Sequence, residues 1–378
     1  MQECSVKTGV FFGTGALDRL GDFPGKRVLI VTDGFMASSG TAEKVAGHLK
    51  GCTYKIFDKV VPEPPIDVVA EGVAALEDVN AELIVALGGG SSIDAAKAIR
   101  SVYEEAAGTT SQIPLVAIPT TSGTGSEVTD YAVITNPAKG VKYPLANADL
   151  AATEAILDPV LTESVPPAIT ADTGLDALTH AIEAYVSVNA SDFTDAWAEK
   201  AAQLVFEYLP RCHQNGSDLE AREKMSNAAC LAGMAFNRAG LGAVHGCAHA
   251  VGARFHLPHG RACQLMLPHV MTFNAELENA RGGNYSRAAI KFAHLAKILG
   301  FSSASVRLGA CNLIREVDKL CRTVGEPASL KQCGVDTADA RAQLNELAEL
   351  AVADPTTSTN PRPVSCDQVV SILEKVLA

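Results

Sequence analysis

Residues 83–99, with the sequence LIVALGGGSSIDAAKAI, decide the fold of this chain. The first five residues are a continuous apolar run, which is typical of a strand buried on both faces of a parallel sheet. Three glycines follow, and glycine allows positive φ angles and a close approach of the backbone to a ligand. The residues after them have helical spacing. The stretch therefore predicts a strand, a glycine turn and a helix in succession.

The same alternation surrounds this stretch. Further strands are predicted at RVLIVTD (27–33), YKIF (54–57) and LVAIP (115–119), and helices at 66–80 and 92–105. Strands that alternate with helices predict a parallel sheet with helices on both of its faces.

The pattern changes after SVPP (164–167). Segments of helical period then follow at 168–187, 192–209, 218–237, 243–254, 281–299, 304–324, 338–352 and 366–377. A Pro-rich loop, DPTTSTNPRP (354–363), separates the last two of them. A chain of 378 residues is too long for one ordinary core. The expected organisation is therefore an α/β domain over residues 1–165 and an all-α domain over residues 166–378.

Composition limits the classes of function. The formal net charge is −12, whereas binding to nucleic acids or anionic membranes requires a basic surface. No apolar run approaches the ~18 residues of a membrane span, and the N-terminus lacks the pattern of a secretory signal. The ten cysteines form no CxxC pair, as is typical of reduced thiols. We therefore expect a cytoplasmic protein that binds neither nucleic acid nor membrane.

The glycine turn is a candidate phosphate site, because the helix after it directs free N–H groups and a positive dipole end at the turn. A second loop, PTTSGTGSEVT (119–129), offers hydroxyl groups at the end of another predicted strand. Two such loops suit an extended, phosphate-bearing ligand. Asp33 closes the first predicted strand, where it can accept hydrogen bonds from ribose. The sequence lacks GxGxxG, so a structural turn with Asp33 as a cap is the alternative.

Five of the nine histidines lie within residues 242–269. Asp176 and His180 are four residues apart on one predicted helix, and His245 and His249 are four apart on another, so each pair projects from one helix face. His259 follows Pro258 about one turn beyond the second helix. A carboxylate with several imidazoles suits a divalent transition metal, and buried structural histidines are the alternative. We interpret Cys247 and Cys263, which lie nearby, as core thiols.

Five segments resemble a known family over essentially the whole chain: GGGSSIDAAKAI, IPTTSGTGSEVT, DTGLDALTHAIEAYVS, GLGAVHGCAHAVGARFHLPHG and TNPRP. They closely resemble the iron-dependent (group III) alcohol dehydrogenase family. DGFMASS, KGVKYPL and SVPPAITADTG are most similar to the 1-propanol dehydrogenases of propanediol-utilising bacteria. The resemblance implies a dehydroquinate-synthase-like fold, with a Rossmann-like nucleotide domain, a helical domain and a cleft between them. It also implies a homodimer or larger homo-oligomer, and it is compatible with association with a bacterial microcompartment.

The resemblance assigns roles to individual residues. The metal ligands that the resemblance implies are Asp176, His180, His245 and His259. It implies that His249 lies beside the substrate as a proton relay. The implied contacts to the pyrophosphate are Gly89, Gly90, Ser91 and Asp94, and the rest of the nicotinamide site is Thr120, Thr121, Ser122, Thr124 and Lys142. Asp33 stands where family members prefer NAD(H) to NADP(H). The sequence does not choose between Fe²⁺ and Zn²⁺.

The implied substrate is a short-chain (C2–C4) aldehyde or primary alcohol, with Tyr131, Val133, Phe236 and Thr356 as pocket residues. Arg238, Arg254 and Arg261 lie in the segments around the pocket and the metal. They are surface residues or, alternatively, anchors for an anionic aldehyde such as sulfoacetaldehyde. A polyol dehydrogenase and a non-catalytic binding scaffold are further alternatives. Every expected ligand position is intact, which favours the enzyme.

Overall fold

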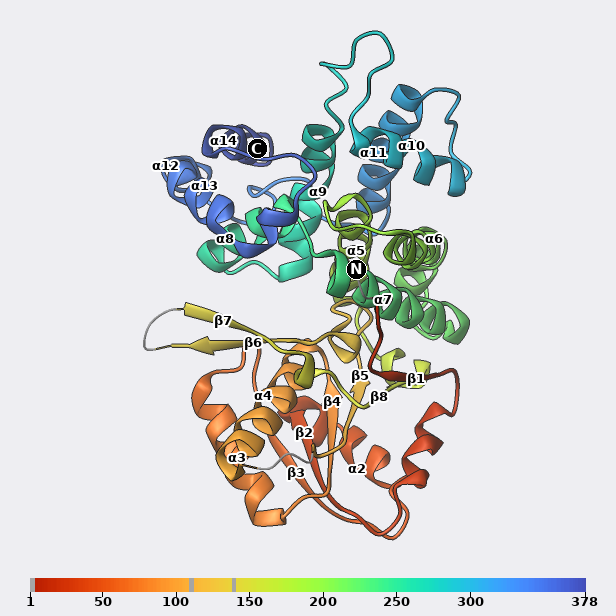
Figure 1. The fold of residues 1–378 in the computed structure, drawn as a ribbon, viewed down its shortest axis with the longest axis vertical. Helices are drawn as coiled ribbons and strands as arrows, with labels where there is room; N and C mark the ends of the chain where they lie inside the picture. Colours follow the sequence, from red (N-terminus) through yellow and green to blue (C-terminus); the bar gives the residue numbers. More distant parts are fainter. Residues whose placement is uncertain (1–3, 109–111, 138–140) are drawn as a thin grey trace. The chain divides into compact units, whose positions relative to one another are not determined.

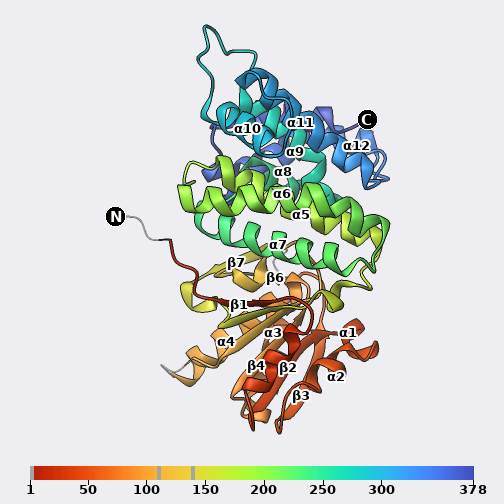
Figure 2. The ribbon, with the colours of Figure 1, turned by 90° about the vertical axis from the view of Figure 1, so that its right-hand side faces the viewer.

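The computed structural model describes residues 4–108, 112–137 and 141–378. The chain divides into two compact units, Met1–Val165 and Pro166–Ala378. The first unit combines strands with helices, and the second is helical (Figure 1, Figure 2). The expected fold class, a parallel α/β domain followed by an all-α domain, is therefore confirmed. None of the described helices is both long enough and apolar enough to cross a membrane.

Six of the described strands form one parallel sheet in the order β1-β8-β5-β4-β2-β3. They are β1 (Gly9–Phe12), β2 (Arg27–Asp33), β3 (Thr53–Val60), β4 (Leu83–Gly88), β5 (Leu115–Pro119) and β8 (Glu154–Leu157). In register, Ile84 of β4 lies opposite Leu29 of β2 and Leu115 of β5. The central strands β4 and β5 are buried at every residue, which explains their continuous apolar sequences.

Helices cover both faces of this sheet. One face packs against α3 (Ile66–Val79) and α4 (Gly90–Ala107). The other packs against the short helices η1 (Ala16–Asp22) and α2 (Thr41–Ala46). Alternate residues of each strand enter the two cores, as for Ile84 in the first and Val85 in the second.

The remaining elements of this unit are short. They are α1 (Gly34–Ser38), η2 (Ser126–Val128), η3 (Ala148–Leu150), η4 (Pro159–Thr162) and an antiparallel hairpin of β6 (Tyr131–Asn136) and β7 (Val141–Ala146). The sequence analysis did not predict this hairpin.

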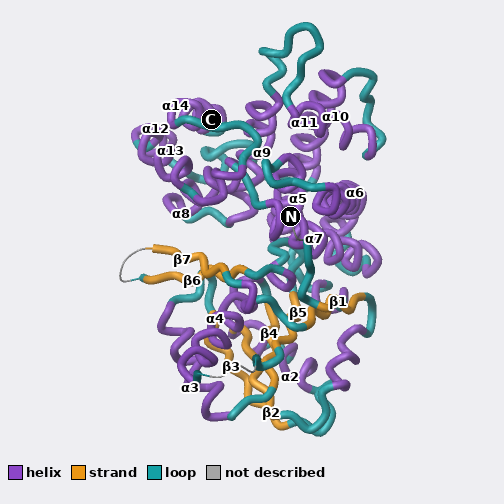
Figure 3. The backbone as a smooth tube through the Cα atoms, in the orientation of Figure 1, coloured by secondary structure: helices purple, strands orange, loops and turns teal. Residues whose placement is uncertain are grey.

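The second unit packs its helices around one apolar core (Figure 3). Its elements are α5 (Pro167–Val186), α6 (Asp192–Gln214), α7 (Leu219–Ala239), α8 (Ala243–Phe255), α9 (His259–Ala275), α10 (Arg287–Ile298), α11 (Val306–Thr323), α12 (Thr337–Ala342), α13 (Leu344–Ala353), η5 (Pro355–Thr359) and α14 (Cys366–Lys375).

Three helix predictions for this unit need correction. The expected helix over 338–352 is two helices, α12 and α13, because the backbone of Gln343 leaves helical geometry. The expected helix over 281–299 begins only at Arg287. The sequence analysis missed α9, which contains Pro268. His259 therefore begins a helix instead of lying in a turn.

Candidate active site

Four side chains of the second unit bring their ligand atoms together. Asp176 and His180 lie one turn apart on α5, His245 lies in α8, and His259 is the first residue of α9. Their ligand atoms all lie within 4.8 Å of one another. Asp176 Oδ1 is 3.8 Å from His180 Nε2 and 3.9 Å from His245 Nε2. Its distance to His259 Nε2 is 3.5 Å. Ligands bound tetrahedrally at about 2.1 Å are about 3.4 Å apart, so this group has nearly the size that a transition metal requires.

The environment of the group also fits a cation. Asp176 Oδ1 and His245 Nε2 are buried and have no hydrogen-bond partner among the described residues. A buried acceptor without a partner is costly, and a metal ion would satisfy both atoms at once. The side chain of His259 is 44% exposed, whereas those of the other three residues are at most 6% exposed. The group is thus buried except at His259.

Glu183 orients the ring of His245. Its Oε2 atom lies 2.6 Å from His245 Nδ1, and its carboxylate also accepts from the N–H groups of Gly242 and Val244 at the start of α8. Burial lowers the pKa of His245 well below its usual value, so the ring is neutral. Nδ1–H therefore donates to Glu183 and Nε2 keeps its lone pair for a metal. Burial likewise raises the pKa of Glu183 to about 8.

Glu183 was missed by the sequence analysis, although a signal for it exists. It follows Asp176 by seven residues on α5. Two helical turns separate the two carboxylates, so they project from the same face of the helix. A search for acidic residues on the ligand face of α5 would have found it.

His249 lies beside the metal-ligand group without belonging to it. Its ring stacks on that of His259, with the centroids 5.3 Å apart, and its Nδ1 atom is 2.8 Å from Asp354 Oδ2. Burial raises the pKa of Asp354, but hydrogen bonds from His249 and Thr356 outweigh this effect, so the pKa lies below its usual value. Thr356 Oγ1 donates to Asp354 Oδ1 at 2.6 Å. Thr356, a predicted pocket residue, thus orients the Asp354 carboxylate, which in turn orients the ring of His249.

Phe236, another predicted pocket residue, lies next to the metal-ligand group. Its ring centroid is 4.5 Å from that of His180. Arg238 lies in the same last turn of α7 and is half-buried. Cys247 and Cys263 are both buried, and burial raises the pKa of the Cys247 thiol to about 12. Such thiols stay protonated, which supports their interpretation as core residues.

In the first unit, the glycine turn joins β4 to α4, and the flanking loops lie side by side. Gly89 is the N-cap of α4, and no side chain caps this helix. Its first N–H groups can therefore serve an anion. A Cβ atom at Gly90 would lie 2.9 Å from Thr124 Cγ2, and one at Gly89 would lie 3.4 Å from Thr121 Oγ1. The loop after β5 thus packs directly on the glycine turn. A larger residue at Gly89 or Gly90 would push the loop away from the turn.

Three of the other predicted nucleotide contacts, Ser91, Thr120 and Ser122, lie in the first turn of α4 or in the loop after β5. Ser91 is in the first turn of α4, and the N–H group of Thr120, a buried residue, donates to Gly88 O at 3.0 Å. Ser122 is half-buried in the loop after β5. Lys142 pairs with Thr135 in the β6–β7 hairpin, and its side chain lies outside the described part of the structure.

Asp33 caps α1 and also approaches the glycine turn. Its Oδ1 atom accepts from the N–H groups of Phe35 and Met36, both at 2.9 Å. Its Oδ2 atom lies 3.4 Å from the position that a Cβ atom would take at Gly88. Asp33 therefore acts as a helix cap, which was the alternative considered from the sequence. Capping uses Oδ1, whereas Oδ2 lies at the glycine turn.

Asp94, which the resemblance implies as a pyrophosphate contact, is hydrogen-bonded within the protein, and that role stays a prediction. Its carboxylate accepts from Ser126 Oγ at 2.6 Å and from the N–H group of Val133 at 3.0 Å. Burial raises its pKa. Asp94 makes these two contacts because it lies beyond the first turn of α4. From there its side chain reaches Ser126 and Val133.

Lys97, one turn further along α4, also binds this segment and was not predicted. It is fully buried, and its Nζ atom donates to the backbone carbonyls of Ser126, Thr129 and Tyr131 at 2.6, 2.8 and 2.7 Å. Burial lowers its pKa to about 8. The predicted pocket residues Tyr131 and Val133 expose their side chains on one face of β6. Lys97 therefore fixes the backbone from which they project.

Arg254 and Arg261, both considered as substrate anchors, are bound by other side chains of the protein. Arg261 makes a bidentate ion pair with Asp172, with contacts of 3.2 and 3.0 Å, and its Nε atom is 3.3 Å from Glu326. Arg254 donates to Gln343 Oε1 on the exposed surface. The guanidinium of Arg261 thus contacts two carboxylates, and its alternative role as an anchor for an anionic substrate stays a prediction.

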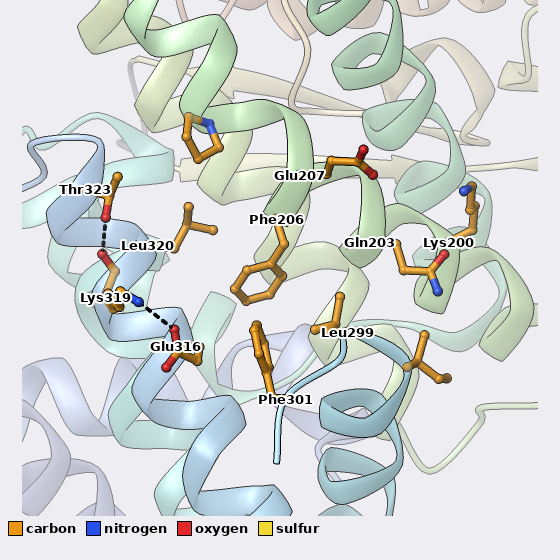
Figure 4. A pocket seen from close by; sticks show the side chains of 12 residues that line it. Lys200, Gln203, Phe206, Glu207, Leu299, Phe301, Glu316, Lys319, Leu320 and Thr323 are labelled. Atoms are coloured by element: carbon orange, nitrogen blue, oxygen red, sulfur yellow. Dashed lines mark hydrogen bonds and ion pairs between the residues drawn. The ribbon is translucent and has the colours of Figure 1, made fainter. Parts of the chain in front are cut away.

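A cavity of about 510 Å³ lies elsewhere in the second unit, between α6, α11 and the segment after α10 (Figure 4). Phe206 and Phe301, which both line it, meet edge to face, and Lys319 pairs with Glu316 at 3.2 Å. None of the predicted site residues lines it. It is therefore distinct from the metal-ligand group.

The parallel sheet with its glycine turn and the aspartate–histidine group define the class of protein, a metal-binding oxidoreductase. Comparison with known families agrees: residues 7–159 match the family "Iron-containing alcohol dehydrogenase", and residues 170–377 match "Fe-containing alcohol dehydrogenase family, C-terminal". The chain belongs to the iron-containing alcohol dehydrogenase family, as its sequence motifs indicate.

Individual relatives match over their whole length. The chain is 43% identical to a 1-propanol dehydrogenase of Salmonella typhimurium and 45% identical to one of Citrobacter freundii, and each match covers all of both chains. Among solved structures, a 1,3-propanediol oxidoreductase superposes with a TM-score of 0.91 at 34% identity, again over all of both chains. The protein is therefore an oxidoreductase of the alcohol dehydrogenase type.

Proposed function

We propose that this protein is a metal-dependent, NAD(H)-linked dehydrogenase that interconverts short-chain (C2–C4) aldehydes and primary alcohols. The observation that carries the proposal is the group of Asp176, His180, His245 and His259, in which Asp176 Oδ1 and His245 Nε2 are buried without a hydrogen-bond partner among the described residues. Two full-length relatives are named 1-propanol dehydrogenases, which supports a neutral three-carbon substrate. Residues 1–165 would then form the nucleotide domain, and residues 166–378 the metal and substrate domain.

The four residues would hold one divalent ion, Fe²⁺ or Zn²⁺. When bound, such an ion acts as a Lewis acid toward a carbonyl or hydroxyl oxygen, while the nicotinamide donates or accepts the hydride. The chain's own part is to hold neutral imidazoles and one carboxylate in place. Glu183 contributes by fixing which nitrogen of His245 carries the proton. Phe236 contributes by excluding water beside His180.

His249 would move the proton that accompanies hydride transfer. The Asp354 carboxylate, whose pKa lies below its usual value, remains ionised and accepts from His249 Nδ1–H. This contact leaves His249 Nε2 as the atom that can donate or accept a proton. The side chain of His249 is 42% exposed, so the proton can continue to solvent.

The glycine turn and the loop after β5 would bind the phosphates of NAD(H). The uncapped start of α4 supports this role, as do the close contacts of Gly89 and Gly90 with Thr121 and Thr124. Asp33 Oδ2, at the same turn, would accept a hydrogen bond from a ribose 2′-hydroxyl and repel a 2′-phosphate. This favours NAD(H) over NADP(H).

A neutral substrate is favoured over an anionic one. The guanidinium of Arg261 is neutralised by Asp172 and Glu326, and Arg254 binds Gln343 at the surface. Tyr131 is a bulky predicted pocket residue, which favours a short substrate. Propanal and 1-propanol are therefore the appropriate test substrates. Cytoplasmic location and homo-oligomerisation remain part of the proposal, and light scattering after size-exclusion chromatography would test the second.

The experiment that tests the proposed function combines metal analysis with a substrate panel. The purified protein should contain one equivalent of iron or zinc, and NADH absorbance at 340 nm should fall when propanal is added. Sulfoacetaldehyde should react more slowly. His259→Ala should lose both metal and activity, whereas Arg254→Ala, an exposed change in the same unit, should retain both. Full metal content and rate in His259→Ala would reject the ligand set.

A further inference from the structure

Arg261 and its two carboxylate partners form a partly buried ion-pair group that the proposed function leaves without a role. Asp172 belongs to α5, and Glu326 follows the end of α11. Both carboxylates are largely buried, with side-chain exposures of 11% and 3%. Bidentate pairing of a guanidinium with a carboxylate fixes orientation as well as distance. The group therefore ties α9 rigidly to α5 and to the segment after α11.

The position of this group in the sequence connects it to the metal-ligand residues. Asp172 precedes the ligand Asp176 by four residues, which is one turn of α5. Arg261 follows the ligand His259 by two residues, in the first turn of α9. A Cβ atom at Gly260 would lie only 2.0 Å from Asp172 O, so the two backbones are in contact where the ion pair forms.

His259 depends on this connection more than the other ligands do. Its side chain is 44% exposed, whereas Asp176, His180 and His245 are held in place by the surrounding core. It lies at the very start of α9, and none of the described side chains caps that helix. Helix ends fray when nothing binds them, so the position of His259 relies on what holds the first turn of α9.

We propose that Arg261 is a positioning residue of the metal centre, which holds His259 against α5 through Asp172 and Glu326 and thereby slows loss of the divalent ion. This inference rests on the proposed function, because it assumes that the four residues bind metal. In this proposal Arg261 serves to retain the metal ion and does not bind the substrate.

The test measures retention of Zn²⁺ directly. The metal-free protein is reconstituted with Zn²⁺ alone, and transfer of the ion to a chromogenic chelator is followed with time. Arg261→Ala should release Zn²⁺ about tenfold faster than the wild type, at the lower end of what residues that support metal ligands contribute. Arg261→Lys keeps the charge but not the bidentate geometry, so it should lie between the two.

Two controls separate positioning from loss of stability. Arg100→Ala removes a buried arginine of α4, in the first unit, that donates to Asp149 O and Ala151 O, and it should destabilise the protein without faster release. Arg254→Ala removes an exposed arginine of α8 and should change neither property. Glu326→Gln keeps the size of its side chain and should accelerate release about two- to threefold, which preserves the test if Arg261→Ala does not fold.

The outcomes distinguish the two proposals. Equal release rates for Arg261→Ala, Arg100→Ala and the wild type would overturn the inference, and so would unchanged release in both Arg261→Lys and Glu326→Gln. A wild type that binds no stoichiometric Zn²⁺ or Fe²⁺ would instead overturn the proposed function, on which the inference rests.

Discussion

Replacing Glu183 with Ala would remove the carboxylate on which both the start of α8 and the ring of His245 depend. Glu183 accepts from the N–H groups of Gly242, Val244 and His245 at 3.0, 2.7 and 3.4 Å, and from His245 Nδ1 at 2.6 Å. All of these donors are buried. Alanine can accept none of the four hydrogen bonds.

The size of the effect follows from these contacts. A buried donor left without a partner costs about 1–3 kcal/mol, so the two shortest contacts alone amount to about 2–6 kcal/mol. The loss is partly offset because the carboxyl group of Glu183 no longer has to be buried, and this burial is the cause of its raised pKa. We therefore expect the free energy of unfolding to fall by about 2–4 kcal/mol. Metal affinity should fall about 10- to 100-fold, or about 1.4–2.7 kcal/mol.

Two assays measure these effects separately. Denaturant unfolding of the metal-free protein gives the change in stability, and competition for Zn²⁺ with a chelator gives the change in affinity. Asp218→Ala is the matched control, because Asp218 caps α7 by accepting from the N–H group of Ala221 and pairs with Arg211, remote from the ligands in sequence. It should lose stability but not metal affinity. If Glu183→Ala binds Zn²⁺ as tightly as the wild type, the orienting role of Glu183 is refuted.

Three further predictions concern the nucleotide, the proton and the buried lysine. Asp33→Gly should raise the ratio of kcat/KM for NADPH to that for NADH about tenfold, and a wild type that uses both equally would contradict the reasoning. Asp354→Asn should lower kcat about tenfold or more and change its pH profile while the metal content stays constant, and loss of metal would instead make His249 a ligand. Lys97→Met should lower stability by about 3–5 kcal/mol at pH 7, measured by denaturant unfolding. Because the folded pKa of Lys97 is about 8 and the unfolded value is near 10.5, the folded state loses the proton first. The wild type should thus gain up to about 3 kcal/mol over this variant as the pH rises from 8 to 10.5, and a constant difference would refute the assignment.

Local patterns in the sequence were enough to locate the central strands and to group the candidate ligands. RVLIVTD and LVAIP coincide with β2 and β5, because a strand buried on both faces must be apolar throughout. The i,i+4 spacing of Asp176 and His180 places both on one face of α5 without knowledge of any other element.

Features that depend on distant parts of the chain could not be predicted in this way. β1 and β8 have four residues each and are strands only because they pair with each other and with β5. The partners that orient the two histidines of α8 are also remote: Glu183 lies 62 residues from His245, and Asp354 lies 105 residues from His249. No local period connects such residues, and the Pro-rich loop around Asp354 reads only as a break between helices.

The direction in which the Arg261 side chain projects depends on one element that the sequence analysis missed, the helix α9. Pro268 suggests a break, but it lies ten residues into the helix, where only one backbone hydrogen bond is lost and apolar packing compensates. If residues 258–261 were a turn, Arg261 could reach a substrate beside His259. In a helix that starts at His259, two residues correspond to about 200° around the axis, so Arg261 projects away from the face of its ligand neighbour. The nearest charges on that side are Asp172, 89 residues earlier, and Glu326, 65 residues later. The direction of one helix therefore turns a candidate substrate anchor into a residue that holds the metal centre together.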